Sequence, residues 1–343
     1  MTDLAQLPQT DPLPIFRQRD GIYATDLLGA AVAHLDFFTW LHKNPSDLAG
    51  ICRAFSFHER PVDVMLSLFC AMGLVEKCDG VFRVSLMARE HLVAGSQWNL
   101  GPYFGSLKER PVCRDFVTIL RTDKPANWGS YKDEQEWAKA MEDEEFARGF
   151  TAAMDCRGVY LGQKLAQTVN LSGSTRLLDI GGGSGIYACA IAARHANLRA
   201  AVLERAPVDA IARAKIGERG LAERVEVLTG DFFAGPLPTG FDAHLYSNVL
   251  HDWDATTVRA LLAKSHVALP AGGRLIIHDM HLNADKTGPL PVASYSAILM
   301  AVTEGRCYSV AEMETWLVAA GFSEVTFALT AADRSVIAAR KAG

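Results

Sequence analysis

Apolar residues follow two different rhythms along the chain. Residues 24–95 carry apolar side chains at steps of three and four, which is the spacing of amphipathic helices. Within this stretch, two short apolar runs are separated by Asp79 and Gly80, and they predict a hairpin that follows the helices. Helical spacing then continues over residues 96–170. The order helix, helix, hairpin is typical of a winged helix.

After the polar Gly/Ser segment 170–176, short apolar runs alternate with helical patterns. This alternation predicts a parallel sheet with helices on both faces. The C-terminus differs, because a helix near 310–320 precedes two strands joined by a short turn at Asp333. The predicted fold class is therefore α/β: a Rossmann-like, doubly wound, mostly parallel sheet with an antiparallel C-terminal hairpin, plus an N-terminal helical, winged-helix domain. The predicted strands are 176–180, 200–204, 225–229, 243–249, 274–280, 324–329 and 334–340, with a helix over 255–268.

The length of 343 residues exceeds the size at which one hydrophobic core stops growing, so we expect more than one domain. We divide the chain into a winged-helix-like domain (1–110), a helical linker (111–170) and an α/β domain (171–343). The composition, 49% hydrophobic and 21% charged, is that of an ordinary folded protein.

Charge and cysteine usage narrow the classes of partner. The net charge is -5 and the basic residues are scattered, which disfavours nucleic acid. The helix that would enter a DNA groove carries only Arg53 and Arg60 among apolar residues. No apolar run approaches the roughly 18 residues that span a bilayer, and the N-terminus lacks the features of a signal peptide. Seven widely spaced cysteines without a CxxC pair favour reduced thiols in the cytoplasm.

A glycine-rich loop follows the first strand of the predicted sheet. Its glycines, in 181–185, let the backbone turn tightly and let a ligand approach closely. Glu204 ends the next strand, where an acid accepts both hydroxyls of a ribose. Asp179 suits a cationic ammonium, and Asp231 and Phe232 suit an adenine amino group and ring face. The spacing GxGxG differs from the GxGxxG of dinucleotide sites, so an adenosyl amino acid is favoured, with a nicotinamide dinucleotide as the alternative.

His251 follows a buried strand, at the sheet edge where open α/β folds bind ligands. We therefore interpret it as a functional residue. Together with Asp252, His278, Asp279 and His281 it also suggests a metal site. However, residues 278 and 279 alternate sides of a strand, and His251 and Asp252 are expected to diverge, so we predict no functional metal.

The segments LLDIGGGSG, GDFF, NVLHDWD, ALPAGGRLIIHD and WLVAAGF resemble, in order and spacing, those of class I S-adenosylmethionine-dependent O-methyltransferases. The similarity is to the branch with caffeate-type, acetylserotonin-type and hydroxyneurosporene-type enzymes, and it covers the whole chain. It implies S-adenosylmethionine as cofactor, S-adenosylhomocysteine as product, and a homodimer whose N-terminal helices help to close the partner's pocket.

The resemblance also implies roles for individual residues. His251 would be the general base, and Asp279 matches its first acidic partner, which is usually a longer Glu. Cys307 stands where the family has a second acid, and Glu304 lies close by and would substitute if the loop shifts. The expected cofactor-binding residues are Asp179, Gly181, Gly183, Glu204, Asp231, Phe232 and Ser247. The expected substrate-binding residues are Phe150, Met154, Asn248 and Met300.

The implied reaction is methyl transfer to a hydroxyl of an aromatic or polyketide-like small molecule in secondary metabolism. Cys307 keeps open a nitrogen or carbon target, or different chemistry on the same fold. A DNA-binding regulator with a ligand-sensing C-terminal half is a further alternative.

Overall fold

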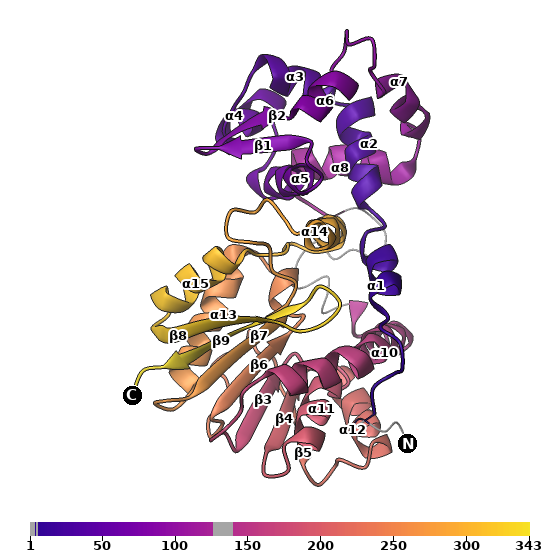
Figure 1. Ribbon diagram of the computed structural model, residues 1–343. Coiled ribbons are helices and arrows are strands. Elements are labelled where there is room, and N and C mark those ends of the chain that lie inside the picture. The colour runs from indigo at the N-terminus through magenta and orange to yellow at the C-terminus, as the bar shows by residue number, and fades with distance from the viewer. Residues whose placement is uncertain (1–3, 5, 126–139) are drawn as a thin grey trace. The chain divides into compact units, whose positions relative to one another are not determined.

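The computed structural model describes residue 4 and residues 6–125 and 140–343 (Figure 1). The chain forms two compact units. The sheet unit comprises Met1–Pro14, Glu134–His281 and Val310–Gly343, and the helical unit comprises Ile15–Asp133 and Leu282–Ser309. The segment Leu282–Ser309 is thus grouped with N-terminal helices, although strands of the sheet precede and follow it in sequence. The predicted domain boundaries at 110 and 170 stay predictions, and the helical prediction for 126–139 lies outside the described residues.

The sheet unit contains a seven-stranded sheet in the order β5-β4-β3-β6-β7-β9-β8. The first five of these strands are parallel, and β9 is antiparallel to both of its neighbours. This confirms the predicted fold class. The strands are β3 (Arg176–Ile180), β4 (Arg199–Glu204), β5 (Val225–Thr229), β6 (Ala243–Ser247), β7 (Arg274–Asp279), β8 (Phe322–Leu329) and β9 (Ser335–Lys341).

Helices cover both faces of this sheet, as Figure 1 shows, with α10, α11 and α12 on one face and α13 and α15 on the other. Strands β3, β4, β6 and β7 are buried almost throughout, as expected for parallel strands covered on both faces. Strand order reverses between β3 and β6, and open α/β sheets bind ligands at the C-terminal ends of the strands beside such a reversal. The helices are α10 (Glu144–Thr168), α11 (Ile186–Arg194), α12 (Val208–Glu218), α13 (Ala255–Ala268) and α15 (Val310–Ala319).

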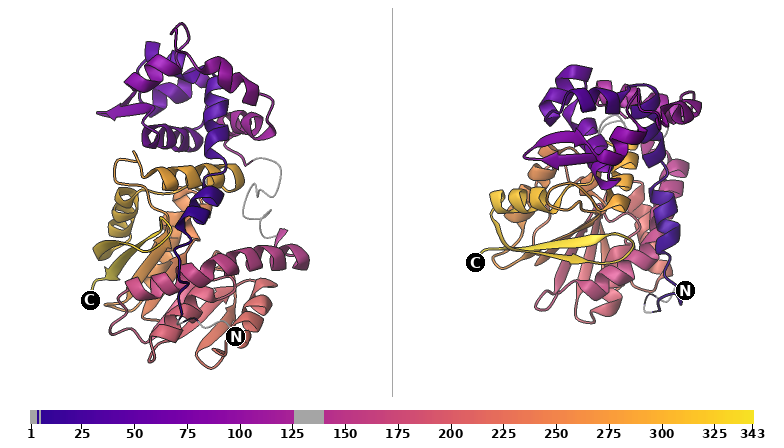
Figure 2. Two further views of the ribbon diagram at one scale, coloured as in Figure 1. Left: turned by 45° about the vertical axis from the view of Figure 1, so that its right-hand side comes forward. Right: turned by 45° about the horizontal axis from the view of Figure 1, so that its top comes forward.

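The helical unit contains the predicted hairpin, in which Asp79 and Gly80 both adopt positive φ between β1 and β2. Helix α14 packs against α5, α2 and α8 of the same unit, and Figure 2 shows α5 and α14 from two further directions. Among the described residues, no helix is both long and apolar enough to cross a membrane. The elements are α1 (Leu13–Asp20, shared with the sheet unit), α2 (Ala24–Ala33), α3 (Phe37–Lys43), α4 (Leu48–Phe55), α5 (Glu59–Ala71), β1 (Val75–Cys78), β2 (Val81–Val84), α6 (Leu86–His91), α7 (Gly101–Phe104), η1 (Gly105–Leu107), α8 (Pro111–Thr122) and α14 (Leu290–Val302).

Candidate active site

The glycine loop joins β3 to α11 at the sheet edge where strand order reverses. Gly181, Gly183 and Gly185 have φ of 67°, 57° and 75°, a region that residues with a Cβ rarely adopt. A Cβ on Gly181 would lie 3.3 Å from the Phe232 ring, so this glycine permits close packing below the loop. A Cβ on Gly183 would meet no atom within 4 Å, so open space lies beside Gly183.

Glu204 ends β4 directly beside this loop. Its Oε1 accepts a hydrogen bond from Gly183 N at 3.0 Å, and its Oε2 accepts one from Arg205 N at 3.0 Å. Burial raises the pKa of Glu204 to about 7, although both backbone bonds oppose that shift and part of the side chain remains exposed. The predicted ribose-binding acid is therefore in contact with one of the predicted cofactor-binding glycines.

Asp179 lies beneath the loop. Its side chain is fully buried, and a Cβ on Gly182 would lie 2.6 Å from Asp179 Cγ. Oδ2 accepts a hydrogen bond from Ala188 N at 3.3 Å, whereas Oδ1 has no hydrogen-bond partner among the described residues. Burial raises the pKa of Asp179 to about 7. The predicted contact of Asp179 with an ammonium group stays a prediction, since this position underlies the loop and has no exposed surface.

The loop after β5 carries the predicted adenine-binding residues. Asp231 Oδ1 accepts a hydrogen bond from Phe233 N at 2.8 Å, which fixes a tight turn. The rings of Phe232 and Phe233 are 4.4 Å apart, and Phe233 contacts Trp253 edge-on at 4.7 Å. Lys264 donates to the carbonyls of Phe232 and Phe233 at 3.0 and 2.7 Å. The loop is therefore held from two sides, and the adenine contact of Asp231 and Phe232 stays a prediction.

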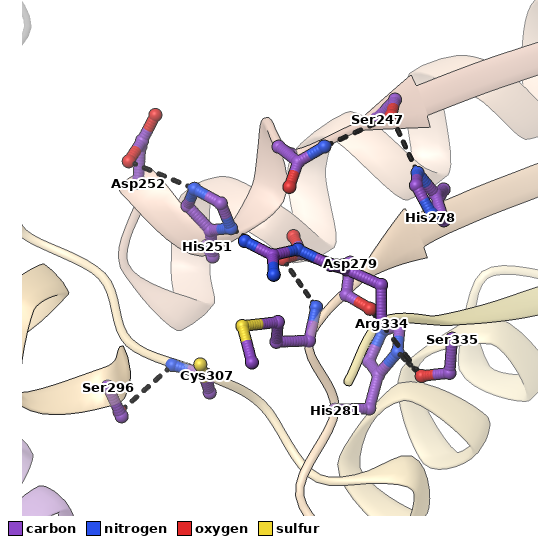
Figure 3. A network of polar contacts seen from close by, with 12 residues as sticks. Ser247, His251, Asp252, His278, Asp279, His281, Ser296, Cys307, Arg334 and Ser335 are labelled. Atoms are coloured by element: carbon purple, nitrogen blue, oxygen red, sulfur yellow. Dashed lines mark hydrogen bonds and ion pairs between the residues drawn. The ribbon is translucent and has the colours of Figure 1, made fainter. Parts of the chain in front are cut away.

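A polar network follows the end of β6 (Figure 3). Ser247 Oγ contacts His278 Nδ1 at 2.9 Å, and Asn248 Nδ2 donates to Tyr187 Oη at 3.0 Å and to Ser247 Oγ at 3.2 Å. Burial lowers the pKa of His278 to about 3, so this imidazole is neutral. Asn248 has φ of 54°, which ends the strand two residues earlier than predicted, and its buried Oδ1 has no hydrogen-bond partner among the described residues. The predicted ligand contacts of Ser247 and Asn248 stay predictions.

His251 lies in the short 3₁₀ turn η2 (Leu250–Asp252), buried between two carboxylates (Figure 3). Its Nδ1 is 2.5 Å from Asp279 Oδ1, so the predicted contact with Asp279 is present despite the shorter side chain. Its Nε2 is 3.4 Å from Asp252 Oδ1. The expectation that His251 and Asp252 diverge is therefore wrong. It assumed an extended strand, whereas in a helical turn neighbouring side chains need not point to opposite sides.

The two carboxylates decide the charge of His251. Burial lowers the pKa of His251, but Asp279 and Asp252 outweigh burial, so the pKa lies above its ordinary value. Arg157, on α10, opposes this increase. Burial raises the pKa of Asp279, but the attraction of the neighbouring His251 has the larger effect, so the pKa of Asp279 lies below its ordinary value. The two carboxylates therefore stabilise the protonated form of His251 relative to an isolated imidazole.

Two further features surround this pair. His281 Nδ1 contacts Ser335 Oγ at 2.8 Å, and burial lowers the pKa of His281 to about 4. Arg334, almost fully buried, donates to the Ala332 carbonyl at 2.7 Å and lies among these residues in Figure 3. In the described part of the chain, no group of three or more His, Cys, Asp or Glu side chains is arranged to hold a metal ion.

Sequence reasoning missed Tyr187, Arg157 and Arg334. Tyr187 could have been found, because it begins the helix that follows the glycine loop. Arg334 directly follows the predicted turn at Asp333, but nothing in the pattern marks it as buried. Arg157 gives no signal, because it is one of two arginines on a helix that also carries a lysine and three acids.

The predicted acceptor-side residues lie in both units. In the sheet unit, Phe150 stacks with Phe146 at 6.4 Å on α10, and Met154 lies one turn further along. In the helical unit, Met300 is buried in α14, and Glu304 is half-buried in the turn that follows. Their contacts with an acceptor, and that of Glu304 with His251, stay predictions. Cys307 is buried and its N–H donates to Ser296 Oγ at 3.1 Å.

Residues 117–323 match the family model of the O-methyltransferase domain. The chain is 33% identical over 312 residues to the 3-hydroxy-5-methyl-1-naphthoate 3-O-methyltransferase of Streptomyces sahachiroi, covering 89% of this chain and 88% of that protein. It is 30% identical over 318 residues to the L-tyrosine C(3)-methyltransferase of Streptomyces lavendulae, covering 90% of this chain and 86% of that protein.

Solved structures of methyltransferases are also similar to this chain. An O-methyltransferase family 2 protein from Planctomyces limnophilus, in complex with apigenin, superimposes with a TM-score of 0.91 at 34% identity, covering 99% of each chain. PigF, a protein from Serratia solved with SAH, gives a TM-score of 0.61 at 26% identity, covering 98% of this chain and all of that one.

Proposed function

The chain belongs to the O-methyltransferase domain family, and from this premise we propose that it transfers the methyl group of S-adenosylmethionine to a hydroxyl of an aromatic or polyketide-like molecule, in secondary metabolism. The observation that carries the proposal is the contact between His251 and Asp279 at the C-terminal edge of the sheet. The name of the Streptomyces sahachiroi relative, which acts on a hydroxynaphthoate, supports an aromatic acceptor.

The cofactor is S-adenosylmethionine, which supplies a methyl group already activated on a sulfonium. The residues present fit it. The space beside Gly183 leaves room for a ligand at the loop, and Glu204 would accept the ribose hydroxyls. Asp231 and Phe232 would hold the adenine. Asn248 Oδ1, buried without a partner among the described residues, is an acceptor that a ligand N–H or O–H would satisfy.

His251 would take the proton of the acceptor hydroxyl at Nε2. Asp279, at Nδ1, fixes the tautomer that leaves Nε2 as the proton acceptor, and it stabilises the imidazolium that forms. A phenol near pKa 10 and an ordinary imidazole near 6.5 differ by about 3.5 units, or about 5 kcal/mol for complete transfer. Because Asp279 and Asp252 raise the pKa of His251, they reduce this mismatch.

Methyl transfer to carbon is the second candidate, supported by the similarity to the L-tyrosine C(3)-methyltransferase. C(3) of tyrosine is the ring carbon next to the hydroxyl-bearing carbon, and removal of the hydroxyl proton makes that carbon nucleophilic. His251 would therefore take the hydroxyl proton in both reactions. In methyl transfer to carbon, the proton on C(3) is then lost to restore the aromatic ring, and the oxygen takes back a proton. Proton NMR of the product distinguishes them, because an O-methyl and a ring methyl group resonate at different positions.

The remaining assignments concern partners and location. We propose a homodimer through the helical unit, where several apolar side chains are exposed: Ile22, Leu86, Met87, Trp98, Leu100 and Tyr103. We propose no nucleic-acid partner, because the Arg60 side chain is only 12% exposed and is bound within its own unit. The seven free cysteines support a reducing cytoplasm. Light scattering of the purified protein tests the dimer.

The experiment that tests the proposed function has two stages. Isothermal titration with S-adenosylmethionine, S-adenosylhomocysteine and NAD should show micromolar binding of the two sulfur compounds only. Turnover is then measured on a panel of hydroxylated aromatics that includes apigenin and 3-hydroxynaphthoates. We expect His251→Ala to abolish turnover while it keeps cofactor affinity, with the exposed His42→Ala as the matched control. Near-full turnover by His251→Ala would remove the base assignment.

A further inference from the structure

A chain of hydrogen bonds crosses the C-terminal edge of the sheet and lies wholly within the sheet unit. Ser247 of β6 and His278 of β7 are register partners on the same face of the sheet, and Ser247 Oγ is 2.9 Å from His278 Nδ1 (Figure 3). His278 Nε2 is 3.3 Å from Thr330 Oγ1, in the turn between β8 and β9. At the other end, Asn248 Nδ2 donates to Ser247 Oγ at 3.2 Å and to Tyr187 Oη at 3.0 Å. The chain thus joins the ends of β6 and β7 to the start of α11.

The centre of this chain is closed to water. The side chains of Tyr187, Ser247 and His278 are all buried, and the rings of Tyr187 and His278 meet edge-on with their centroids 5.5 Å apart. Buried polar groups of this kind have to satisfy one another, because water cannot take the place of a lost partner. A change at one member therefore passes to the next.

The direction of donation along the chain follows from what each group can do. Both protons of Asn248 Nδ2 are used, so Ser247 Oγ accepts one of them and keeps its own hydrogen for His278. Burial lowers the pKa of His278 to about 3, so its imidazole is neutral and carries a single N–H. Nδ1 therefore accepts from Ser247, and Nε2 donates to Thr330.

This direction decides which atom of Asn248 is left over. Because Nδ2 faces Ser247 and Tyr187, Oδ1 points away from them, and it is buried without a hydrogen-bond partner among the described residues. If Ser247 donated to Asn248 instead, the amide would turn over and Nδ2 would take the place of Oδ1. The next residue, Val249, lies against the glycine loop, since a Cβ on Gly181 would lie 3.2 Å from its Cγ2. The unpartnered Oδ1 thus belongs to the edge of the sheet where the cofactor is expected.

We propose that His278 is a positioning residue for ligand binding: by accepting from Ser247, it holds the Asn248 amide with Oδ1 turned to the ligand, as the acceptor for a ligand N–H or O–H. The inference rests on the proposed function, which places the ligands at this edge. Such a donor has two sources, the ammonium and hydroxyl groups of the cofactor or a hydroxyl of the methyl acceptor. His278 acts on either of them through Ser247 and Asn248.

Two substitutions and their combination test this coupling. His278→Leu removes the acceptor, so Ser247 turns its hydrogen to Asn248 and the amide turns over; affinity for the ligand that bears the donor should fall about 10-fold. Asn248→Asp presents an oxygen in both directions, because the hydroxyls of Ser247 and Tyr187 can donate to the second oxygen. When Asn248→Asp is already present, His278→Leu should therefore cost less than about 2-fold.

Two further variants separate this role from a structural one. His244→Leu is the matched control, because this second buried imidazole, on β6, has no partner at either ring nitrogen among the described residues. It should leave the affinity for both ligands unchanged. His278→Asn keeps an acceptor near the place of Nδ1 and should retain most of the affinity that His278→Leu loses.

The measurements are the Kd of S-adenosylhomocysteine by titration, KM and kcat for the best acceptor of the hydroxy-aromatic panel, and the melting temperature. A loss in Kd assigns the donor to the cofactor, and a loss in KM alone assigns it to the acceptor. Unchanged Kd and KM in His278→Leu would overturn the inference, and so would an equal loss with and without Asn248→Asp.

Two precautions keep the test decisive. If His278→Leu does not fold, Ser247→Ala breaks the same chain with little loss of volume, and its loss should likewise vanish when Asn248→Asp is present. The wild type is measured first. Binding and turnover by the wild type establish the proposed function whatever the variants show, whereas a wild type that binds neither S-adenosyl compound would end both proposals.

Discussion

The carboxylate of Asp252 faces Nε2 of His251, the nitrogen that would receive the acceptor's proton, at 3.4 Å. A unit charge at this distance stabilises the imidazolium by about 1 kcal/mol at the dielectric constant of water and about 5 kcal/mol at an effective value of 20. The Asp252 side chain is 36% exposed, so solvent screening places the effect near the lower limit. Replacing the carboxylate by an amide should lower the pKa of His251 by about 1 unit.

The sign of the kinetic effect follows from the role of His251. Its pKa lies above the ordinary value of 6.5, and only the neutral imidazole accepts a proton, so kcat/KM should rise with pH through that pKa. In Asp252→Asn this acidic limb should move about 1 pH unit lower, which makes the variant faster than the wild type at acidic pH. The loss of an acid near the site would then increase activity.

The assay is kcat/KM for the acceptor from about pH 5.5 to 9, because this ratio reports groups of the free enzyme. Asp254→Asn is the matched control: this nearby exposed acid caps α13 by accepting from Thr257 N at 2.8 Å. The control should lower the melting temperature slightly and leave the limb in place. A limb that stays fixed, or moves to higher pH, in Asp252→Asn would refute the reasoning.

Three further predictions concern the base, the core and the glycine loop. Asp279→Asn should lower kcat by on the order of 100-fold or more, with normal cofactor binding by titration, because the Nδ1 partner and the correct tautomer are lost; a kcat within about tenfold of the wild type would contradict this. His244 is fully buried, and both of its ring nitrogens lack hydrogen-bond partners among the described residues. Burial lowers its pKa to about 4, so between pH 6.5 and 4 the unfolded chain binds a proton that the folded chain does not. The free energy of unfolding is therefore unaffected by His244 above pH 6.5 and decreases as the pH falls towards 4. His244→Leu should remove this loss, about 3 kcal/mol in total, and raise the melting temperature at pH 5; an unchanged pH dependence would count against it. Gly183→Ala should weaken S-adenosylmethionine binding measured by titration, because φ at this position is 57° and the added Cβ would enter the open space beside the loop. Gly217→Ala on α12 is the control: its Cβ would also meet no atom within 4 Å, and it should leave binding unchanged.

The sequence predicted the parts of the molecule that local patterns encode. The alternation of apolar runs gave the parallel strands, and the turn at Asp333 indicated the antiparallel hairpin of β8 and β9. The contact of His251 with Asp279 was implied by the family resemblance, which matched Asp279 to the first acidic partner of the base, and the structure contains it. The fold class followed from this alternation, and the family followed from the ordered motifs around the strand ends.

The remaining features depend on backbone angles and distant contacts. Asp252 lies beside His251 because Asn248 adopts a left-handed conformation and a 3₁₀ turn follows it. Hydrophobic periodicity predicts neither feature. Arg60 donates a hydrogen bond to the Thr303 carbonyl at 3.2 Å, but the two residues are far apart in sequence and no local pattern pairs them. The grouping of Leu282–Ser309 with the N-terminal helices is likewise decided by packing and not by sequence order.

This grouping has a consequence for how new specificities arise in the chain. The helical unit is discontinuous: Ile15–Asp133 and Leu282–Ser309 are separated by most of the sheet unit. A recombination that exchanges only the N-terminal part would place foreign residues at positions 60 and 63, opposite an unchanged turn after α14. The two segments therefore have to be inherited, or exchanged by an engineer, as one module.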